Sequence, residues 1–266
     1  MSAPLRFGTY LAPNMLPVYR AIARQVGRSL GVETELVVET SYESCAQDVN
    51  DVCFVCSLPY VTFERQGIRP AVPVAAPVLQ GERYEGRPIY FSDVIVRAED
   101  PARGFPDLRG RSWAYNEPLS HSGYGITRYH LARLGETRGF FGRVIEAGFH
   151  ETSIRMVADG EVDASAIDSQ VLAVAMREDP SLAERLRVVE ALGPSTIQPI
   201  AVSRRLPEPM RGEIRAVLEE MGNDPRCRAT LDRGIVERFV AVDERSYDDI
   251  RTMLETCEDA AFMTLR

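Results

Sequence analysis

The sequence predicts an α/β fold with two lobes, each built on a mainly parallel sheet flanked by helices. Short apolar strands alternate with amphipathic helices along most of the chain, a pattern typical of parallel sheets. Polar segments that carry Gly and Pro interrupt this alternation twice, as expected where a chain passes between lobes. The 266 residues, 45% of them hydrophobic, suffice to build both cores.

The first lobe begins with a strand over residues 4–10 and a helix over 15–31, whose apolar side chains recur at helical spacing. Gly31 is the expected stop of that helix. Strands at 33–40 and 52–56, a helix at 59–67 and an extended stretch at 71–79 complete the series.

The second lobe opens with a strand at 90–97. Strands at 111–116, 143–148 and 162–168 then alternate with helices that run from about 120 to 134 and from about 152 to 160. A helix, a strand and a polar crossing follow within 181–205, before a helix at 207–222. We place the hinges near 86–92 and 193–200, so that lobe 1 comprises 1–90 and 197–266 and lobe 2 comprises 91–196.

Composition limits the classes of function. The net charge of −8 and a pI near 5.1 argue against a nucleic-acid surface or an anionic membrane as partner. All 31 positive charges are arginines, which excludes Schiff-base chemistry on a lysine. We expect no membrane span and no signal peptide, so the chain is either cytoplasmic or the mature form of an exported protein.

The cysteines do not resemble a disulfide framework. Their number, five, is odd, and they are scattered along the chain. Cys53 and Cys56 form a C-x-x-C pair, but it lies within an apolar strand and has no second Cys or His pair nearby. We expect free thiols and neither a metal nor a cofactor.

Ligands of open parallel sheets bind beyond the carboxyl ends of the strands, where loop amides and helix N-termini converge. The segments that leave the predicted strands are rich in hydroxyl groups and carry two of the three histidines. In the first lobe they supply Tyr10, Tyr42 and Ser57, and in the second they supply Ser120, His121, Ser122, Gly123, His150 and Asp168.

The helix that begins near Ser120 offers more donors than a cap requires. One serine hydroxyl suffices to cap a helix, whereas this run offers Ser120, Ser122, an imidazole and unpaired backbone amides. Gly123 lacks the Cβ that would keep an anion from the backbone, so a compact oxyanion fits here. The alternative is an ordinary serine cap with a glycine for tight packing, and Asp168 could equally cap the next helix. His130, in mid-helix, reads as a packing or surface residue.

The stretches "YFSDVIVRAEDP", "NEPLSHSGYGITRYHL" and "GRVIEAGFHETSIRMVADGEVDASAIDS" resemble the phosphate/phosphite/phosphonate-binding proteins of ABC transporters, which are type II periplasmic binding proteins. The resemblance spans residues 5–222 and is most specific between 88 and 172. It implies that the run from Ser120 to Gly123 grips phosphonate oxygens, that His150 matches the Gly-x-His loop of the family, and that Tyr42 and Tyr90 match its strand-exit tyrosines.

The sequence departs from the family pattern at several positions. His121 stands where the family usually has threonine, so the site could hold a protonated imidazole against a dianion or accept a larger ligand. Gln170 and Gln198 align with the carboxylates of aminoalkylphosphonate binders, which disfavours 2-aminoethylphosphonate. An inward-pointing Asp168 could accept a hydrogen bond from a protonated P–OH group.

We therefore expect a monomeric solute-binding protein that captures a small oxyanion between two closing lobes and passes it to an ABC permease. The resemblance implies an extracytoplasmic location. The alternative is a cytoplasmic enzyme or ligand sensor on the same fold, acting on a small acidic metabolite, with His121 or His150 as acid or base and Asp168 orienting it. Fold-level analogy alone does not decide between binding and catalysis.

Overall fold

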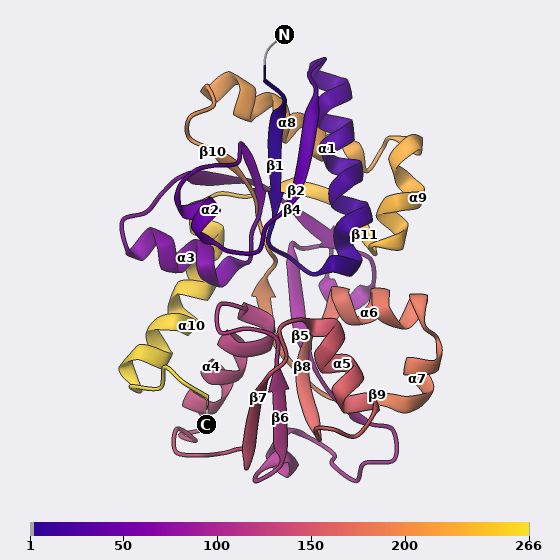
Figure 1. Ribbon diagram of the computed structural model, residues 1–266, viewed down its shortest axis with the longest axis vertical. Coiled ribbons are helices and arrows are strands. Elements are labelled where there is room, and N and C mark those ends of the chain that lie inside the picture. Colours follow the sequence, from indigo (N-terminus) through magenta and orange to yellow (C-terminus); the bar gives the residue numbers. More distant parts are fainter. Residues whose placement is uncertain (1–2, 266) are drawn as a thin grey trace. The chain divides into compact units, whose positions relative to one another are not determined.

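The computed structural model describes residues 3–265, which form two compact units. Unit 1 comprises the residues up to Ile89 and Thr196–Asp248, and unit 2 comprises Tyr90–Ser195 and the residues from Asp249 onward. Each unit is an α/β structure with its own sheet (Figure 1), which confirms the predicted fold class.

The sheet of unit 1 has the strand order β11-β4-β10-β3-β1-β2. Its strands are β1 (Leu5–Thr9), β2 (Thr34–Val38), β3 (Val52–Phe54), β4 (Ala71–Leu79), β10 (Ile200–Ser203) and β11 (Val236–Ala241). The pairs of β1 with β2 and β3 are parallel, as predicted, whereas β10 and β11 pair antiparallel with their neighbours. The sheet is therefore mixed rather than mainly parallel, because two strands of the returning chain enter it in the opposite direction.

Helices flank this sheet. They are α1 (Leu16–Leu30), α2 (Glu43–Ala46), α3 (Ser57–Arg65), α8 (Glu208–Met221) and α9 (Pro225–Arg233), with short 3₁₀ turns η1 (Pro13–Met15), η2 (Glu82–Tyr84) and η5 (Glu244–Tyr247). Helix α1 ends at Gly31, which adopts a left-handed conformation with φ 66° and so closes the helix at the residue where the sequence places its stop. Figure 1 shows α1 running alongside β1 and β2.

The sheet of unit 2 has the strand order β7-β6-β8-β5-β9. Its strands are β5 (Ile89–Arg97), β6 (Ser112–Tyr115), β7 (Arg143–Glu146), β8 (Ala164–Asp168) and β9 (Leu186–Thr196). Strand β6 is parallel to β7 and β8, and β8 is antiparallel to β5. The helical elements are η3 (Phe105–Leu108), η4 (His121–Gly125), α4 (Ile126–Arg133), α5 (His150–Ala158), α6 (Ser169–Glu178), α7 (Ser181–Arg185) and α10 (Asp248–Asp259).

An aromatic cluster fixes β6, the strand that leads to the predicted site. The indole of Trp113 stacks on Phe141 at 4.5 Å between ring centroids, and Phe105 stacks on Phe140 at 5.3 Å. The imidazole of His130 packs edge-on against Phe105 at 4.6 Å, as expected of a packing histidine. The site is therefore attached to a rigid, well-packed strand.

The C-terminal segment belongs to the core of unit 2. Phe262 and Leu265 are buried there together with Trp113 and Tyr124. The boundaries predicted from the sequence place Phe262 and Leu265 in lobe 1, with the rest of 197–266. The pattern of an amphipathic helix gives the face that will be buried but not the partner that covers it, and here the partner is the hydrophobic surface of α4 and β6.

All five cysteines are buried, and none of them forms a disulfide bond within residues 3–265. Within residues 3–265, no helix combines the length and the apolar character needed to cross a membrane.

Candidate functional site

The predicted helix start lies directly after the loop that follows β6. Ser120 is the N-cap residue: its backbone is extended, and its Oγ accepts a hydrogen bond of 3.1 Å from the backbone amide of Gly123. The turn His121–Gly125 has π-helical geometry and continues into α4. Such turns are frequent at functional sites. The ordinary capping role considered in the sequence analysis is thus present, and it engages one of the two serines.

Ser122 is the second serine, and it contacts a histidine from the next βα loop. Its Oγ lies 2.8 Å from Nε2 of His150, the first residue of α5, and 3.4 Å from Oγ of Ser120. Both members of the pair are buried. Burial lowers the pKa of His150 to about 4, so its imidazole is neutral at physiological pH. A neutral imidazole that donates from Nε2 leaves the Ser122 hydroxyl proton available to an anionic ligand.

The second ring nitrogen of His150 is also buried. Among residues 3–265, its Nδ1 has no hydrogen-bond partner. Buried polar atoms normally have partners, so an unsatisfied atom beside a helix start calls for an explanation. A ligand with a protonated oxygen that donates to this nitrogen is one.

His121 does not turn toward His150. Its Nε2 lies 3.0 Å from Oγ of Ser195 on β9, and its ring lies 6.4 Å from that of Tyr90 on β5. Burial, and secondarily the positive charge of Arg128, lower the pKa of His121 to about 3. Burial of the ring therefore favours the neutral imidazole in this structure, and the protonated imidazole facing a dianion stays a prediction.

The structure leaves little room for a side chain at Gly123, for a reason that the sequence does not reveal. A Cβ at this position would clash with Oδ1 of Asn116, which packs against the turn from the preceding loop. The contact with Asn116 is thus sufficient to explain why glycine stands here, and the predicted role of Gly123 in giving an anion access to the backbone stays a prediction. The Oδ1 atom of Asn116 is itself buried and has no hydrogen-bond partner among residues 3–265.

Asp168 and Tyr90 lie on neighbouring strands of the same sheet, since Asp168 pairs with Ser92 where β8 meets β5. Oδ1 of Asp168 accepts hydrogen bonds from the backbone amides of Gln170, at 2.8 Å, and Val171, at 3.3 Å. The capping alternative for Asp168 is therefore the observed arrangement for that oxygen. Tyr90 is fully buried.

The predicted residues of unit 1 form a separate set. The rings of Tyr10 and Tyr42 stack at 5.0 Å, with 15° between their planes. The hydroxyl of Tyr10 also contacts Oγ of Ser44 at 2.7 Å and accepts a hydrogen bond of 3.0 Å from Asn50. Burial raises the pKa of Tyr10, so this tyrosine stays protonated. Ser57 is the first residue of α3 and is fully buried, and its Oγ has no partner within residues 3–265.

Ser195 and Asn116 contact residues of the candidate site, but the sequence does not predict them as site residues. Ser195 lies in a Pro-rich segment that reads as a crossing, so its contact with His121 depends on the register of β9. Asn116 belongs to the loop that the sequence does select, and its place in that loop, shortly before Gly123, could have identified it as a candidate.

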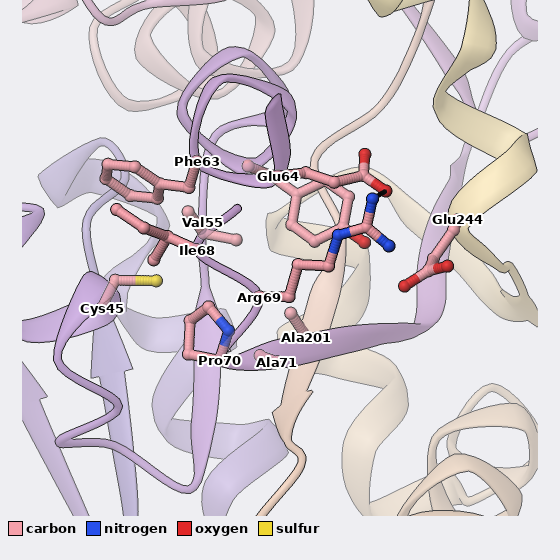
Figure 2. Close-up of a pocket in the computed structure, with 11 residues that line it drawn as sticks. Cys45, Val55, Phe63, Glu64, Ile68, Arg69, Pro70, Ala71, Ala201 and Glu244 are labelled. Atoms are coloured by element: carbon pink, nitrogen blue, oxygen red, sulfur yellow. Dashed lines mark ion pairs between the residues drawn. The ribbon is translucent and has the colours of Figure 1, made fainter. Parts of the chain in front are cut away.

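A pocket of a different character lies in unit 1 (Figure 2). Apolar side chains line most of it, including Val55, Phe63 and Ile68, and Arg69 forms an ion pair of 3.6 Å with Glu64 at its edge. The pocket contains none of the predicted site residues. Its apolar lining and the carboxylates of Glu64 and Glu244 do not suit a small anion.

No metal centre emerges within the described part of the chain, since residues 3–265 bring together no group of three or more His, Cys, Asp or Glu side chains able to hold an ion.

Comparison with known proteins places this geometry in context. The family described as "ABC transporter, phosphonate, periplasmic substrate-binding protein" matches residues 9–247. Among solved structures, a binding protein component of an ABC phosphonate transporter from Pseudomonas aeruginosa is similar, with a TM-score of 0.83 and 16% identity over 98% of this chain and 88% of that chain.

Two further structures share the fold. A protein from Prochlorococcus marinus, solved in complex with methylphosphonate, has a TM-score of 0.81 and 16% identity over 96% of this chain and 98% of that chain. A Xanthomonas citri protein bound to chloride ion has a TM-score of 0.72 and 17% identity over 98% of this chain and 99% of that chain. At such identities the structures establish the shared fold, and the family match rests on the sequence.

Proposed function

Because the chain belongs to the family of periplasmic substrate-binding proteins of phosphonate ABC transporters, we propose that it binds a small tetrahedral oxyanion of the phosphonate class at the start of η4 and α4. The observation that carries this proposal is the buried Ser122–His150 pair, with Oγ and Nε2 at 2.8 Å. It supplies a directed, neutral hydrogen-bond donor, the Ser122 hydroxyl, at a helix N-terminus, where the backbone dipole favours negative charge.

Neutral donors are a suitable way to bind an anion that must later be released. The imidazoles of His121 and His150 are both uncharged in the folded protein, and the pKa of each is lowered by burial. Hydrogen bonds from neutral groups to a charged ligand still contribute about 1.5–3 kcal/mol each. The affinity then comes from several such bonds together and not from one strong ion pair.

A solved relative and the side chains near the helix start indicate which oxyanion to test first. The Prochlorococcus marinus protein was solved with methylphosphonate, which makes methylphosphonate the first ligand to try. By the family resemblance, Gln170 and Gln198 align with the carboxylates of aminoalkylphosphonate binders, so 2-aminoethylphosphonate should bind more weakly. We propose that Tyr10, Tyr42 and Ser57 of unit 1, and Tyr90 of unit 2, also contact the ligand, as the family resemblance implies.

The protein is a small-ligand-binding component of an ABC transporter, which implies a permease as partner. We propose that it acts as a monomer outside the cytoplasm, because the family consists of periplasmic proteins.

The experiment is isothermal titration with methylphosphonate, phosphate, phosphite, sulfate and 2-aminoethylphosphonate, supported by thermal shift. A ligand at one hundred times its Kd should stabilise the protein by about 2.7 kcal/mol, which a melting curve resolves. We expect methylphosphonate to bind and Ser122→Val to abolish binding while the variant stays folded.

The matched control is Ser165→Ala. Ser165 is likewise a buried serine of unit 2, but its hydroxyl donates to the backbone oxygen of Ala114 at 2.9 Å. This variant should lose some stability and keep its affinity. If no oxyanion of the panel binds, or if Ser122→Val binds as the parent protein does, the proposed function or its site is wrong.

A further inference from the structure

Arg128 carries a buried positive charge beneath the helix start. Its side chain on α4 is 4% exposed, and its guanidinium carbon lies 4.9 Å from the ring centroid of Tyr124, one turn earlier. Helical side chains lean toward the N-terminus of their helix, and here the contact with Tyr124 fixes that direction. The charge therefore lies at the level of the turn His121–Gly125, not at the far end of α4.

The charge has no acidic partner in the described structure. Within residues 3–265, Arg128 forms no ion pair with a carboxylate; Nη1 donates to the backbone oxygen of Met263 at 3.0 Å, and Nε has no hydrogen-bond partner. By contrast, Arg111, which is more exposed than Arg128, pairs with Asp100 at 2.6 Å. Burying a charge without an acidic partner costs free energy, so this guanidinium calls for an explanation.

The field of this charge reaches the residues that follow Ser120. Burial is the main cause of the lowered pKa of His121, the first residue of the turn, and the charge of Arg128 is the second cause. It also opposes the burial that raises the pKa of Cys257 on α10. The thiol of Cys257 and the imidazole of His121 are both neutral at physiological pH, so neither offsets the guanidinium. The turn thus lies in the field of this guanidinium in addition to that of the helix dipole.

We propose that Arg128 is a positioning residue that sets the charge of the preferred ligand: its guanidinium makes the helix-start site select a doubly charged oxyanion over a singly charged one of the same shape. This inference rests on the proposed function. At a separation of roughly 10 Å and an effective dielectric constant of about 20, each unit of ligand charge gains about tenfold in affinity from one buried cation.

The test compares two ligands that share a shape and differ in charge. Methylphosphonate, at a pH above its second ionisation, is a dianion, and methanesulfonate is a monoanion. In the parent protein we expect methylphosphonate to bind more tightly. In Arg128→Gln the ratio of the two affinities should fall about tenfold, because the dianion loses one more unit of interaction. Arg128→Lys keeps the charge and should keep the ratio within about threefold.

A matched control comes from the same helix. Arg133 lies over Tyr129 just as Arg128 lies over Tyr124, with its guanidinium carbon 5.9 Å from the ring centroid, but it is solvent-exposed. Arg133→Gln should leave the ratio unchanged, because water and salt screen an exposed charge.

Two further measurements keep the proposal falsifiable. Cys257→Asp adds a carboxylate beside Arg128 without removing the guanidinium or its bond to Met263, and it should lower the ratio as Arg128→Gln does. If methanesulfonate binds too weakly to titrate, methylphosphonate alone decides, with a loss of about a hundredfold in Arg128→Gln and little loss in Arg128→Lys.

The possible failures are distinguishable. If Arg128→Gln weakens both ligands equally, or if Arg128→Lys behaves like Arg128→Gln, the residue acts only through packing and the inference is overturned. If the parent protein binds neither ligand, the proposed function itself fails.

Discussion

Oγ of Ser122 lies 2.8 Å from Nε2 of His150, and this contact joins the starts of two helices that are 28 residues apart in the chain. Ser122 belongs to the turn that leads into α4, and His150 is the first residue of α5. The positive ends of two helix dipoles therefore point to one buried polar pair. A neutral imidazole at this place can fix the direction of the serine hydroxyl, so that the hydroxyl faces a ligand as a donor.

Replacing His150 should therefore weaken ligand binding more than it weakens the fold. In His150→Ala, Ser122 loses the partner that orients its hydroxyl, so the hydroxyl no longer points to the ligand as a donor. Hydrogen bonds to a charged group contribute about 1.5–3 kcal/mol, so we expect the affinity for methylphosphonate to fall roughly 10- to 100-fold, measured by isothermal titration.

His130→Ala is the control for this prediction. His130 also packs in unit 2, where its ring contacts Phe105 at 4.6 Å, but it lies in mid-helix on α4. This variant should lower the melting temperature and leave the affinity unchanged. Equal affinities of His150→Ala and the parent protein would remove His150 from the site.

Acid should destabilise the protein through its two buried histidines. The pKa of His121 is lowered to about 3 and that of His150 to about 4, against 6.5 for an unperturbed histidine. Between these limits the unfolded chain takes up protons that the folded protein does not, so the free energy of unfolding falls as the pH falls from about 6.5 toward 4. Each histidine contributes a slope of about 1.4 kcal/mol per pH unit at most.

Urea unfolding at several pH values between 7 and 4.5 measures this slope. In His150→Gln the slope should be smaller, by at most about 1.4 kcal/mol per pH unit, because one of the two groups no longer titrates. His130→Gln is the comparison, since the pKa of this half-buried histidine is lowered but by less. Identical slopes in the parent protein and in His150→Gln would mean that His150 titrates normally in the folded state.

Local pattern and a general rule for parallel sheets suffice to predict much of the site. Ser120, Ser122 and His150 lie where strands of unit 2 give way to helices, and alternation of apolar and polar residues places those strands. The rule that ligands bind beyond the carboxyl ends of parallel strands selects the loops that follow those strands, because it depends only on the order of strands and helices. It does not give the pairing of side chains between loops.

The remaining features depend on contacts between distant segments. The partner of His121 is Ser195, 74 residues later, and this contact follows from the register of β9. The antiparallel direction of β10 depends on how the chain returns to unit 1, which alternation of strands and helices does not encode. Asp168 illustrates a third case, since its residue type fits a cap and a ligand contact equally well, and only coordinates show that Oδ1 accepts the amides of α6.

Gly123 provides a test of tight packing at the helix start. In a helical turn, alanine is normally favoured over glycine, yet a Cβ at this position would clash with Oδ1 of Asn116. We expect Gly123→Ala to lower the free energy of unfolding by about 1–3 kcal/mol, the usual cost of overpacking a buried site, as measured by urea denaturation.

A double-mutant cycle separates this clash from other effects. Asn116→Ala removes the amide that the new methyl group would meet, so Gly123→Ala should cost little in that background, and the coupling energy should be about 0.5–3 kcal/mol. Gly212→Ala on α8 is the control: a Cβ there meets nothing within 4 Å, and the variant should be more stable by about 0.5–1 kcal/mol. Additive effects of Gly123→Ala and Asn116→Ala would show that the cost of the new methyl group does not come from its contact with Asn116.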